Sequence, residues 1–309
     1  MTNFREHIFI TGATASGKTA VGLTLAERIG GEIVSLDSMA VYRGMEIGTA
    51  VPNADELKRV RHHLIGIVEP VVEYSVADYL RDAAAAVNDI CSRGKRVIFV
   101  GGTALYLKTM LRGFFDAPPA NVELRKALAD EAAMNGQNWL HGQLAKIDPT
   151  AAAKLHPNDS RRLIRAIEVY RTTGRTMSDW QCQFDKPVPR EECRVFVIDR
   201  ERKTLYERID KRVDKMMDDG LLDEARRLQS LLRSVPDGLT KSTASQALGY
   251  RELFGCFDGK STMEESLNAI KTHTRQFAKR QLTWFRSLSE CRFVQAEKAD
   301  GTILSEADK

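Results

Sequence analysis

A phosphate-binding loop is encoded close to the N-terminus. The pattern G-x-x-x-x-G-K-[ST] is met at every fixed position by Gly12-Ala13-Thr14-Ala15-Ser16-Gly17-Lys18-Thr19, between an apolar stretch and a helical one. Backbone N–H groups of such a loop and the helix N-terminus hold phosphate oxygens. We expect Lys18 to supply charge to the phosphates and the Thr19 hydroxyl to ligate Mg²⁺. The alternative is a strand–helix turn without a ligand.

Asp37 is the acid best placed to act beside this loop. An NTPase usually also needs an acid at the end of a hydrophobic strand to organise Mg²⁺, but the most apolar stretch, 96–100, runs into Gly101-Gly102-Thr103. The stretch 33–36 leads instead to Asp37. Because ligands bind at the carboxyl ends of parallel strands, we expect Asp37 near the loop, as a magnesium ligand or a general base. The alternative is a carboxylate that caps the next turn.

Two predicted amphipathic helices carry positive charge. In 158–175, an apolar arc faces three arginines that fall within about 100° of one another: Arg161, Arg162 and Arg165. The stretch 266–289 has no acidic residue, and Trp284 stands close to one basic stripe of Lys271, Arg275, Lys279 and Arg286. Cations beside an aromatic side chain suit RNA, whose phosphates pair and whose bases stack. The alternative for both helices is a solvated basic face.

Arg212 occupies an unusual position. On the predicted helix 203–217 it falls inside the apolar stripe, between Leu205 and Met216. A guanidinium on a core-facing stripe needs a partner. The two explanations are a structural salt bridge and a role toward bound phosphates.

The elements that must position these residues alternate over the first 112 residues. Strands are expected at 7–11, 33–36, 63–68 and 96–100, with helices such as 18–29 and 76–91 between them. From 121 to 180 only helices are expected, with Asp148-Pro149 starting one and Gly136 and Gly174 ending others. A strand returns at 193–198. The prediction is an α/β core with a P-loop NTPase-like parallel sheet, formed by 1–115 and 190–309, and an all-helical insertion domain at 116–189.

Composition excludes several protein classes. The chain has 309 residues, 43% of them hydrophobic and 28% charged, which is ordinary for a globular protein. The net charge of +4 does not by itself indicate a nucleic-acid binder. No apolar run approaches the roughly 18 residues of a membrane span, and the start does not resemble a signal peptide. Five irregularly spaced cysteines without a Cys-x-x-Cys pair predict reduced thiols in a cytoplasmic protein and no zinc site.

Taken together in order, these segments resemble the tRNA dimethylallyltransferases (tRNA isopentenyltransferases) of the bacterial type. The resemblance spans nearly the whole chain and includes the loop 12–19, Asp37-Ser-Met-Ala-Val-Tyr-Arg-Gly-Met-Glu-Ile-Gly-Thr-Ala50, Gly101-Gly-Thr-Ala-Leu-Tyr106, His156-Pro-Asn-Asp-Ser-Arg-Arg-Leu-Ile-Arg-Ala-Ile-Glu168, Arg208-Ile-Asp-Lys-Arg212, Leu248-Gly-Tyr-Arg251 and Lys279-Arg-Gln-Leu-Thr-Trp-Phe-Arg286. No cysteine–histidine pattern matches the zinc finger of eukaryotic cytosolic relatives.

The resemblance implies transfer of a dimethylallyl group from dimethylallyl diphosphate to N6 of the adenosine just 3′ of the anticodon. The loop 12–19 would then hold the donor's diphosphate and not ATP. Asp37 would accept a proton or a hydrogen bond from the adenine amine. Thr19 and Arg212, with Lys18 and Mg²⁺, would stabilise the leaving diphosphate.

The resemblance also implies a set of tRNA contacts. The adenosine must turn out of its stack to reach the donor, and the helical insertion would clamp the anticodon stem-loop of a tRNA bound by a monomer. The implied contacts are Asp37, Ser38, Met39, Ala40, Thr103, Arg125, Arg161, Arg162, Leu163, Ile164, Arg165, Gln246, Gly249, Tyr250, Arg251, Lys279, Arg280, Gln281, Trp284 and Arg286.

The chain departs from the family's sequence pattern at two places, and three other functions are alternatives to the one that the resemblance implies. Val51 stands where the family often has lysine, and Gln246-Ala247 where it often has Arg-Cys, so weaker contacts are expected there. The rivals are a P-loop kinase that uses ATP, a dimethylallyltransferase that acts on free adenylate, and an RNA-binding protein with a vestigial loop. The basic helices favour an RNA acceptor, and intact Lys18, Thr19 and Asp37 argue against a vestigial loop.

Overall fold

The computed structural model describes residues 2–114, 118–136 and 138–307. The chain divides into two compact units, one formed by Met1–Leu111 with Val188–Lys309 and the other by Arg112–Pro187. The sequence-based boundary at 115/116 falls on 115–117, which lie outside the described residues.

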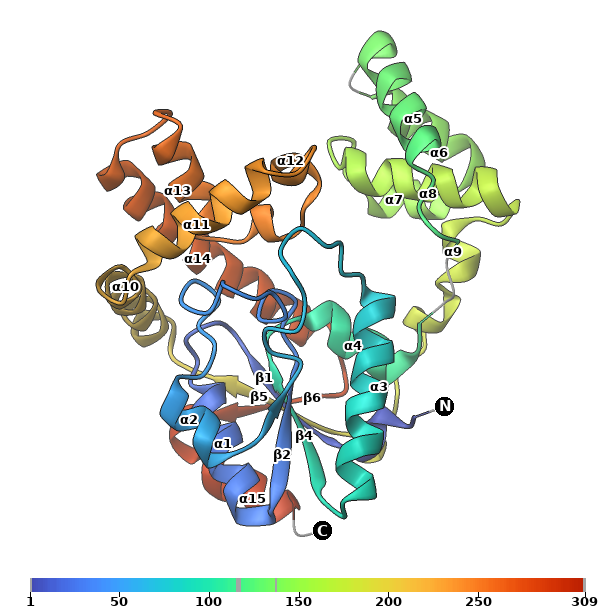
Figure 1. The fold of residues 1–309 in the computed structure, drawn as a ribbon. Coiled ribbons are helices and arrows are strands. Elements are labelled where there is room, and N and C mark those ends of the chain that lie inside the picture. Colours follow the sequence, from blue (N-terminus) through green and yellow to red (C-terminus); the bar gives the residue numbers. More distant parts are fainter. Residues whose placement is uncertain (1, 115–117, 137, 308–309) are drawn as a thin grey trace. The chain divides into compact units, whose positions relative to one another are not determined.

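A six-stranded, fully parallel sheet forms the centre of the first unit (Figure 1). Its strands are β1 (Ile8–Gly12), β2 (Gly31–Ser35), β3 (His62–His63), β4 (Arg96–Gly101), β5 (Arg194–Asp199) and β6 (Cys291–Gln295). They are arranged in the order β3-β2-β4-β1-β5-β6. Ile10 of β1 pairs with Val100 of β4 and Phe196 of β5. Both strands that flank β1 are buried along most of their length, as expected when helices cover both faces of a parallel sheet.

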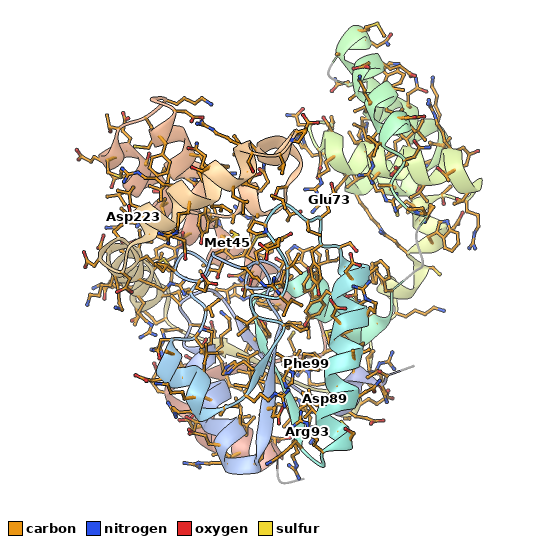
Figure 2. The ribbon with its side chains drawn as sticks, viewed as in Figure 1. Met45, Glu73, Asp89, Arg93, Phe99 and Asp223 are labelled. Carbon is orange, nitrogen blue, oxygen red and sulfur yellow. The ribbon has the colours of Figure 1, made fainter. Side chains whose placement is uncertain are left out.

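Helices cover the two faces of this sheet. On one face, α3 (Val76–Ser92) and α4 (Ala104–Arg112) pack on Phe9 and Phe99, whose rings stack 4.8 Å apart. Phe99 and the Asp89–Arg93 ion pair of the α3 end are labelled in Figure 2. On the other face, α1 (Lys18–Ile29) and α15 (Ala299–Ala307) bury Ile10, Ile98 and their neighbours. Helices therefore pack on both faces of the strands β1, β2 and β4.

The chain after β5 forms a helical layer of the same unit. It contains α10 (Arg202–Asp218), α11 (Leu221–Arg233), α12 (Gly238–Lys241), α13 (Tyr250–Phe257) and α14 (Met263–Arg286). Its core, which contains the buried Tyr250, also includes Val41, Tyr42 and Met45 from the segment that follows β2. The 3₁₀ turn Ala244–Gln246 also belongs to this layer, through the buried Ala244. The first unit further contains α2 (Ala54–Arg59) and the short 3₁₀ turns Phe4–Glu6, Arg190–Glu192 and Ala296–Lys298, whereas the turn Cys182–Asp185 lies in the second unit.

The second unit is built from helices around its own small core. These are α5 (Val122–Asn135), α6 (Trp139–Ile147), α7 (Pro149–Lys154), α8 (Ser160–Thr173) and α9 (Met177–Trp180). Leu128, Leu144 and Leu163 are fully buried in it. The Asp148 side chain caps α7 by accepting from the Ala151 N–H at 2.9 Å, and Pro149 follows it. The predicted helix start at Asp148-Pro149 and the stops at Gly136 and Gly174 are confirmed.

Several sequence-based expectations about elements are corrected. The expected strand 63–68 is wrong: only His62 and His63 pair with β2, because Leu64 and Gly66 adopt positive φ and turn the chain away. The strand β6 was not expected, since its burial is irregular along the edge of the sheet. Of the expected basic helices, 158–175 is α8 over Ser160–Thr173, and 266–289 is α14 over Met263–Arg286. Within the described residues, no helix is both long and apolar enough to cross a membrane.

Candidate active site

The phosphate loop joins β1 to α1 in a conformation that needs its glycines. Gly12 has φ +146° and Gly17 φ +103°. A Cβ on Gly12 would lie 2.7 Å from the Ile198 carbonyl oxygen of β5 and 2.9 Å from Ser16 Oγ, so no larger residue fits there. Gly17 caps α1, whose first residues are Lys18 and Thr19. The predicted strand–loop–helix context of the motif is therefore present.

Side chains from α10, from α14 and from the segment between β5 and α10 hold this loop. Arg212 of α10 donates to Thr14 Oγ1. Gln281 of α14 accepts a hydrogen bond from the Thr14 N–H at 2.8 Å. Arg208 Nε donates to the Ala15 carbonyl at 2.9 Å, and Arg200 Nε donates to the Ser16 carbonyl at 3.2 Å. The loop is thus surrounded by cations that the sequence places about 200 residues away.

Lys18 has no acidic partner within ion-pair distance in the described part of the chain. Its Nζ donates to the Ala13 carbonyl at 3.3 Å. Burial, together with the like charge of Arg212, lowers the pKa of Lys18 to about 8. A buried cation in this state favours an anionic ligand, because the ligand supplies the charge partner that the protein lacks.

Asp37 uses one carboxylate oxygen to cap a turn and leaves the other available. Oδ1 accepts from the Met39 N–H at 2.8 Å and from the Ala40 N–H at 3.3 Å. In the described chain, Oδ2 has no hydrogen-bond partner. Thr103 Oγ1 steadies the same turn by accepting from the Ser38 N–H at 3.0 Å. The two alternatives for Asp37, turn cap and acid facing the site, are therefore compatible.

Arg212 does not form the structural salt bridge that was one of its two explanations. Among the described residues no carboxylate lies within 4.0 Å of its guanidinium, and Thr14 is its hydrogen-bond partner. Burial lowers the pKa of Arg212 to about 10, against the opposing effect of the Asp37 carboxylate. Arg212 thus remains a partly buried cation directed at the phosphate loop.

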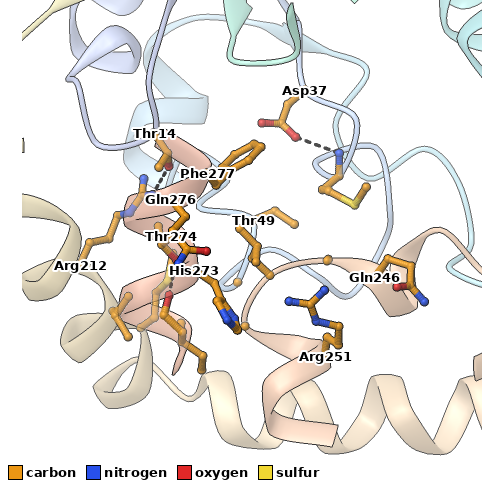
Figure 3. A pocket seen from close by; sticks show the side chains of 18 of the residues that line it. Thr14, Asp37, Thr49, Arg212, Gln246, Arg251, His273, Thr274, Gln276 and Phe277 are labelled. Carbon is orange, nitrogen blue, oxygen red and sulfur yellow. Dashed lines mark hydrogen bonds between the residues drawn. The ribbon is translucent and has the colours of Figure 1, made fainter. Parts of the chain in front are cut away.

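Two cavities meet at these side chains. The larger, of about 510 Å³, lies against α10, α13 and α14, and Figure 3 shows part of its lining. The smaller, of about 80 Å³, is lined by Lys18, Thr19 and the ends of β2 and β4. Both cavities are lined by Thr14, Asp37, Thr49 and Arg212. A ligand held at the loop and a second ligand in the larger cavity would meet beside Asp37.

Comparison with known proteins assigns the family. A model of the IPP transferase family matches residues 40–288. The chain belongs to the IPP transferase family. A tRNA dimethylallyltransferase of Geobacter metallireducens is 46% identical over 301 residues, which are 96% of this chain and 95% of that protein. A tRNA dimethylallyltransferase of Geobacillus thermodenitrificans is 43% identical over 281 residues, 91% of this chain and 87% of that protein.

Solved structures of IPP transferase relatives have the same fold. The full-length tRNA isopentenylpyrophosphate transferase of Bacillus halodurans has a TM-score of 0.69 and 37% identity, covering 97% of this chain and 95% of that one. A eukaryotic dimethylallyltransferase acting on tRNA has a TM-score of 0.77 and 27% identity, covering 97% of this chain and 77% of that one. The sequence-based resemblance and the α/β fold with a parallel sheet are confirmed.

The structure gathers many of the implied tRNA contacts of this IPP transferase around the larger cavity. Its lining includes Ser38, Met39, Thr103, Gln246, Gly249, Arg251, Arg280 and Gln281. Ala40 lines the smaller cavity. Lys279, Arg280 and Trp284 line a separate shallow groove along α14. Arg286 is exposed at the end of the same helix.

Four implied tRNA contacts have side chains that pack wholly or partly inside the protein. Leu163 is fully buried in the core of the helical unit, with Ile164 packed partly against that core. Tyr250 is fully buried, and its hydroxyl donates to Glu224 Oε1 at 2.6 Å. Gln281 is 7% exposed and bonds backbone groups. The side chains of Leu163 and Tyr250 fill hydrophobic cores, so the tRNA contact predicted for these two residues stays a prediction that only their backbone atoms can fulfil.

Part of the expected basic surface is neutralised within the protein. Arg125 and Arg165 both bond Glu168, whose side chain is fully buried, at 3.0 and 2.6 Å. On α14, Lys271 pairs with Asp214 at 2.5 Å and Arg275 with Asp210 at 2.7 Å. Arg162 pairs with Asp159 at 3.2 Å. Arg161, Lys279, Arg280 and Arg286 have no acidic partner among the described residues. The free positive charge is therefore smaller than the sequence suggested.

Sequence reasoning missed several residues of the site. Thr49 lines both cavities, and His273 lines the larger one while its Nδ1 lies 2.7 Å from Glu252 Oε1. His62 lines the smaller cavity, and its buried Nε2 has no hydrogen-bond partner. Thr49 lies inside the quoted family segment, which was a usable signal. His62 and His273 belong to no motif in the sequence. Their place in the site depends on residues that are distant in sequence and near only in the fold.

Proposed function

We propose that this chain transfers the dimethylallyl group of dimethylallyl diphosphate to N6 of the adenosine just 3′ of the anticodon of tRNA. Family membership supports the reaction class. The observation that carries the proposal is that Asp37, Thr14 and Arg212 line both the cavity of the phosphate loop and the larger cavity beside it. A diphosphate and an acceptor base would meet at these side chains.

In the proposed reaction, a bond forms between N6 and the terminal allyl carbon, and the bond from that carbon to the diphosphate oxygen breaks. The electron pair leaves with the diphosphate, so negative charge grows at the phosphate loop. Lys18 and Arg212 stabilise that charge. The folded protein already holds both cations in place, so they need not reorganise during the reaction. The N6 proton passes to Asp37 Oδ2, whose partner oxygen keeps the carboxylate in place.

The residues fit Mg²⁺ of the kind held mainly by substrate phosphates. The Thr19 hydroxyl lines the smaller cavity and has no hydrogen-bond partner in the described chain. Among the described residues, no group of three or more His, Cys, Asp or Glu is placed to hold a metal. A magnesium ion bound by Thr19, phosphate oxygens and water would add to the neutralisation of the leaving group.

The larger cavity suits one nucleobase and its sugar. Its volume of about 510 Å³ lies within the range of small-ligand sites. A base inside an anticodon loop must leave its stack to enter it. We propose that the exposed cations and Trp284 of α14, with α8 of the helical unit, hold the surrounding RNA. The proposed setting is the cytoplasm, where the five free cysteines stay reduced, and the proposed working form is a monomer.

Incubation of the purified protein with Mg²⁺, radiolabelled dimethylallyl diphosphate and an acceptor tests the proposal. The acceptors are unmodified tRNA, the same tRNA with guanosine 3′ of the anticodon, and AMP. We expect label in the first alone. Label in AMP would assign the chain to adenylate prenylation. Label in none of them, together with phosphate release in a parallel incubation with ATP, would assign a kinase-like activity.

A further inference from the structure

Gln281 of α14 joins two turns that lie at the carboxyl ends of adjacent strands. Its Oε1 accepts from the Thr14 N–H at 2.8 Å, and its Nε2 donates to the Gly102 carbonyl at 2.9 Å. The first turn is the phosphate loop after β1, and the second follows β4. The side chain is 7% exposed, so water does not readily replace these bonds.

Gly102 allows this amide to approach the backbone closely. A Cβ on Gly102 would lie 2.4 Å from Gln281 Nε2. Ala278, one turn earlier on α14, packs with Ala13 of the loop and with Leu205 and Ile209 of α10, and Leu282 adds to this cluster. The helix therefore rests directly on the loop, and Gln281 is its polar contact there.

Thr14 is consequently held from two helices at once. Gln281 engages its backbone N–H, and Arg212 of α10 engages its hydroxyl. A backbone N–H that already donates to Gln281 is not available to a phosphate oxygen. The phosphate donors of the loop are therefore those after Thr14, and their direction depends on how Thr14 is fixed.

We infer that Gln281 is a positioning residue for the donor's diphosphate and not a contact for tRNA, although it stands within a basic segment and also lines the larger cavity. The inference rests on the proposed function only for the identity of the donor. Without the amide, the loop samples other conformations. The apparent affinity for diphosphate then falls in proportion to the fraction of molecules whose loop can still bind it.

The test compares Gln281→Met with Lys279→Ala, a matched change on the same helix. Inorganic diphosphate with Mg²⁺ and an unmodified anticodon stem-loop are titrated separately into each protein by calorimetry. For Gln281→Met we expect at least about a tenfold weaker diphosphate affinity and RNA affinity within twofold of wild type, because two buried backbone groups lose their partner. Lys279→Ala is expected to weaken RNA binding and leave diphosphate binding unchanged.

A second readout follows the loop itself. Hydrogen exchange at the Thr14 amide should be faster in Gln281→Met, and Gln281→Asn, which keeps the amide but is shorter, should give an intermediate diphosphate affinity even if the Met variant does not fold. Weaker RNA binding with unchanged diphosphate affinity in either variant would overturn the inference. Failure of the wild type to transfer label to tRNA would instead defeat the proposed function, since diphosphate binding is measured without transfer.

Discussion

Asp37 shows at the scale of one residue how a structural and a chemical role share a carboxylate. Oδ1 caps the turn through Met39 and Ala40, and Oδ2 is free to accept a proton. Asp37→Asn keeps the capping oxygen and loses the base. We expect turnover to fall by about 10²-fold or more, with an unchanged melting temperature and retained tRNA binding. Asp37→Ala should lose turnover and lower the melting temperature as well. Unchanged turnover in the Asn variant would remove the base assignment.

Arg212 provides a second residue-scale prediction. Its guanidinium donates a hydrogen bond to Thr14 and lacks an acidic partner in the described chain. We therefore expect Arg212 to matter more for the phosphate loop than for the stability of the fold. Arg212→Ala should lower turnover more than tRNA affinity, measured by single-turnover kinetics and gel shift. A purely structural arginine would instead give a lower melting temperature with normal kinetics per folded molecule.

The lowered pKa of Lys18 predicts how donor binding depends on pH. The free enzyme holds this pKa at about 8, and a bound diphosphate raises it by supplying negative charge. Binding therefore takes up a proton near pH 8, and donor affinity is full below pH 8 and falls up to tenfold per pH unit above it. Titrations with dimethylallyl diphosphate from pH 7 to 9.5 check this. Lys18→Arg, which stays charged, serves as the control, and a flat wild-type profile would contradict the assignment.

At the scale of elements, Glu224 joins the segment after β2 to the C-terminal helices. This buried carboxylate accepts from the Ile47 and Gly48 N–H groups at 3.0 and 2.9 Å and from the Tyr250 hydroxyl. A Cβ on Gly48 would lie 2.5 Å from the Tyr250 ring, so the two elements meet closely. The neighbouring Thr49, which lines both cavities, is placed by this junction.

Glu224→Gln should therefore weaken both stability and activity. The amide puts a donor against a donor, and an unsatisfied buried group costs about 1–3 kcal/mol. Tyr250→Phe removes one of the three bonds and should cost about 0.5–1.5 kcal/mol. Urea denaturation measures both free energies of unfolding. Equal stability of Glu224→Gln and wild type would show that the junction is not maintained by this carboxylate.

At the scale of the whole molecule, RNA affinity depends on which cations remain free. Lys271 and Arg275 are paired with acids of α10, whereas Lys279 and Arg286 have no acidic partner among the described residues. Lys279→Ala should reduce the slope of log affinity against log salt by about 1. Lys271→Ala should leave the slope nearly unchanged. Filter-binding titrations of tRNA at several salt concentrations measure both slopes, and equal effects would refute the distinction.

Local patterns were enough to predict the phosphate loop, the helices of the second unit and the strand at 96–100. The loop depends on glycines and on an adjacent strand and helix, which are all near in sequence. The prediction of a strand at 63–68 was wrong because the positive φ of Leu64 turns the chain. The apolar residues of this segment therefore lie in a turn. The edge strand β6 had no periodic signal, since it is defined by pairing with β5.

By itself the sequence determined the kind of fold, the family and the residues of the phosphate loop, because these depend on the order and type of neighbouring side chains. Only the tertiary structure decided that Arg212 and Gln281 hold Thr14. It also decided that Tyr250 and Leu163 are buried, and that Glu168 forms ion pairs with Arg125 and Arg165. A guanidinium or amide has the same intrinsic chemistry on any helix. Its role depends on which partner from a distant segment lies within hydrogen-bond distance.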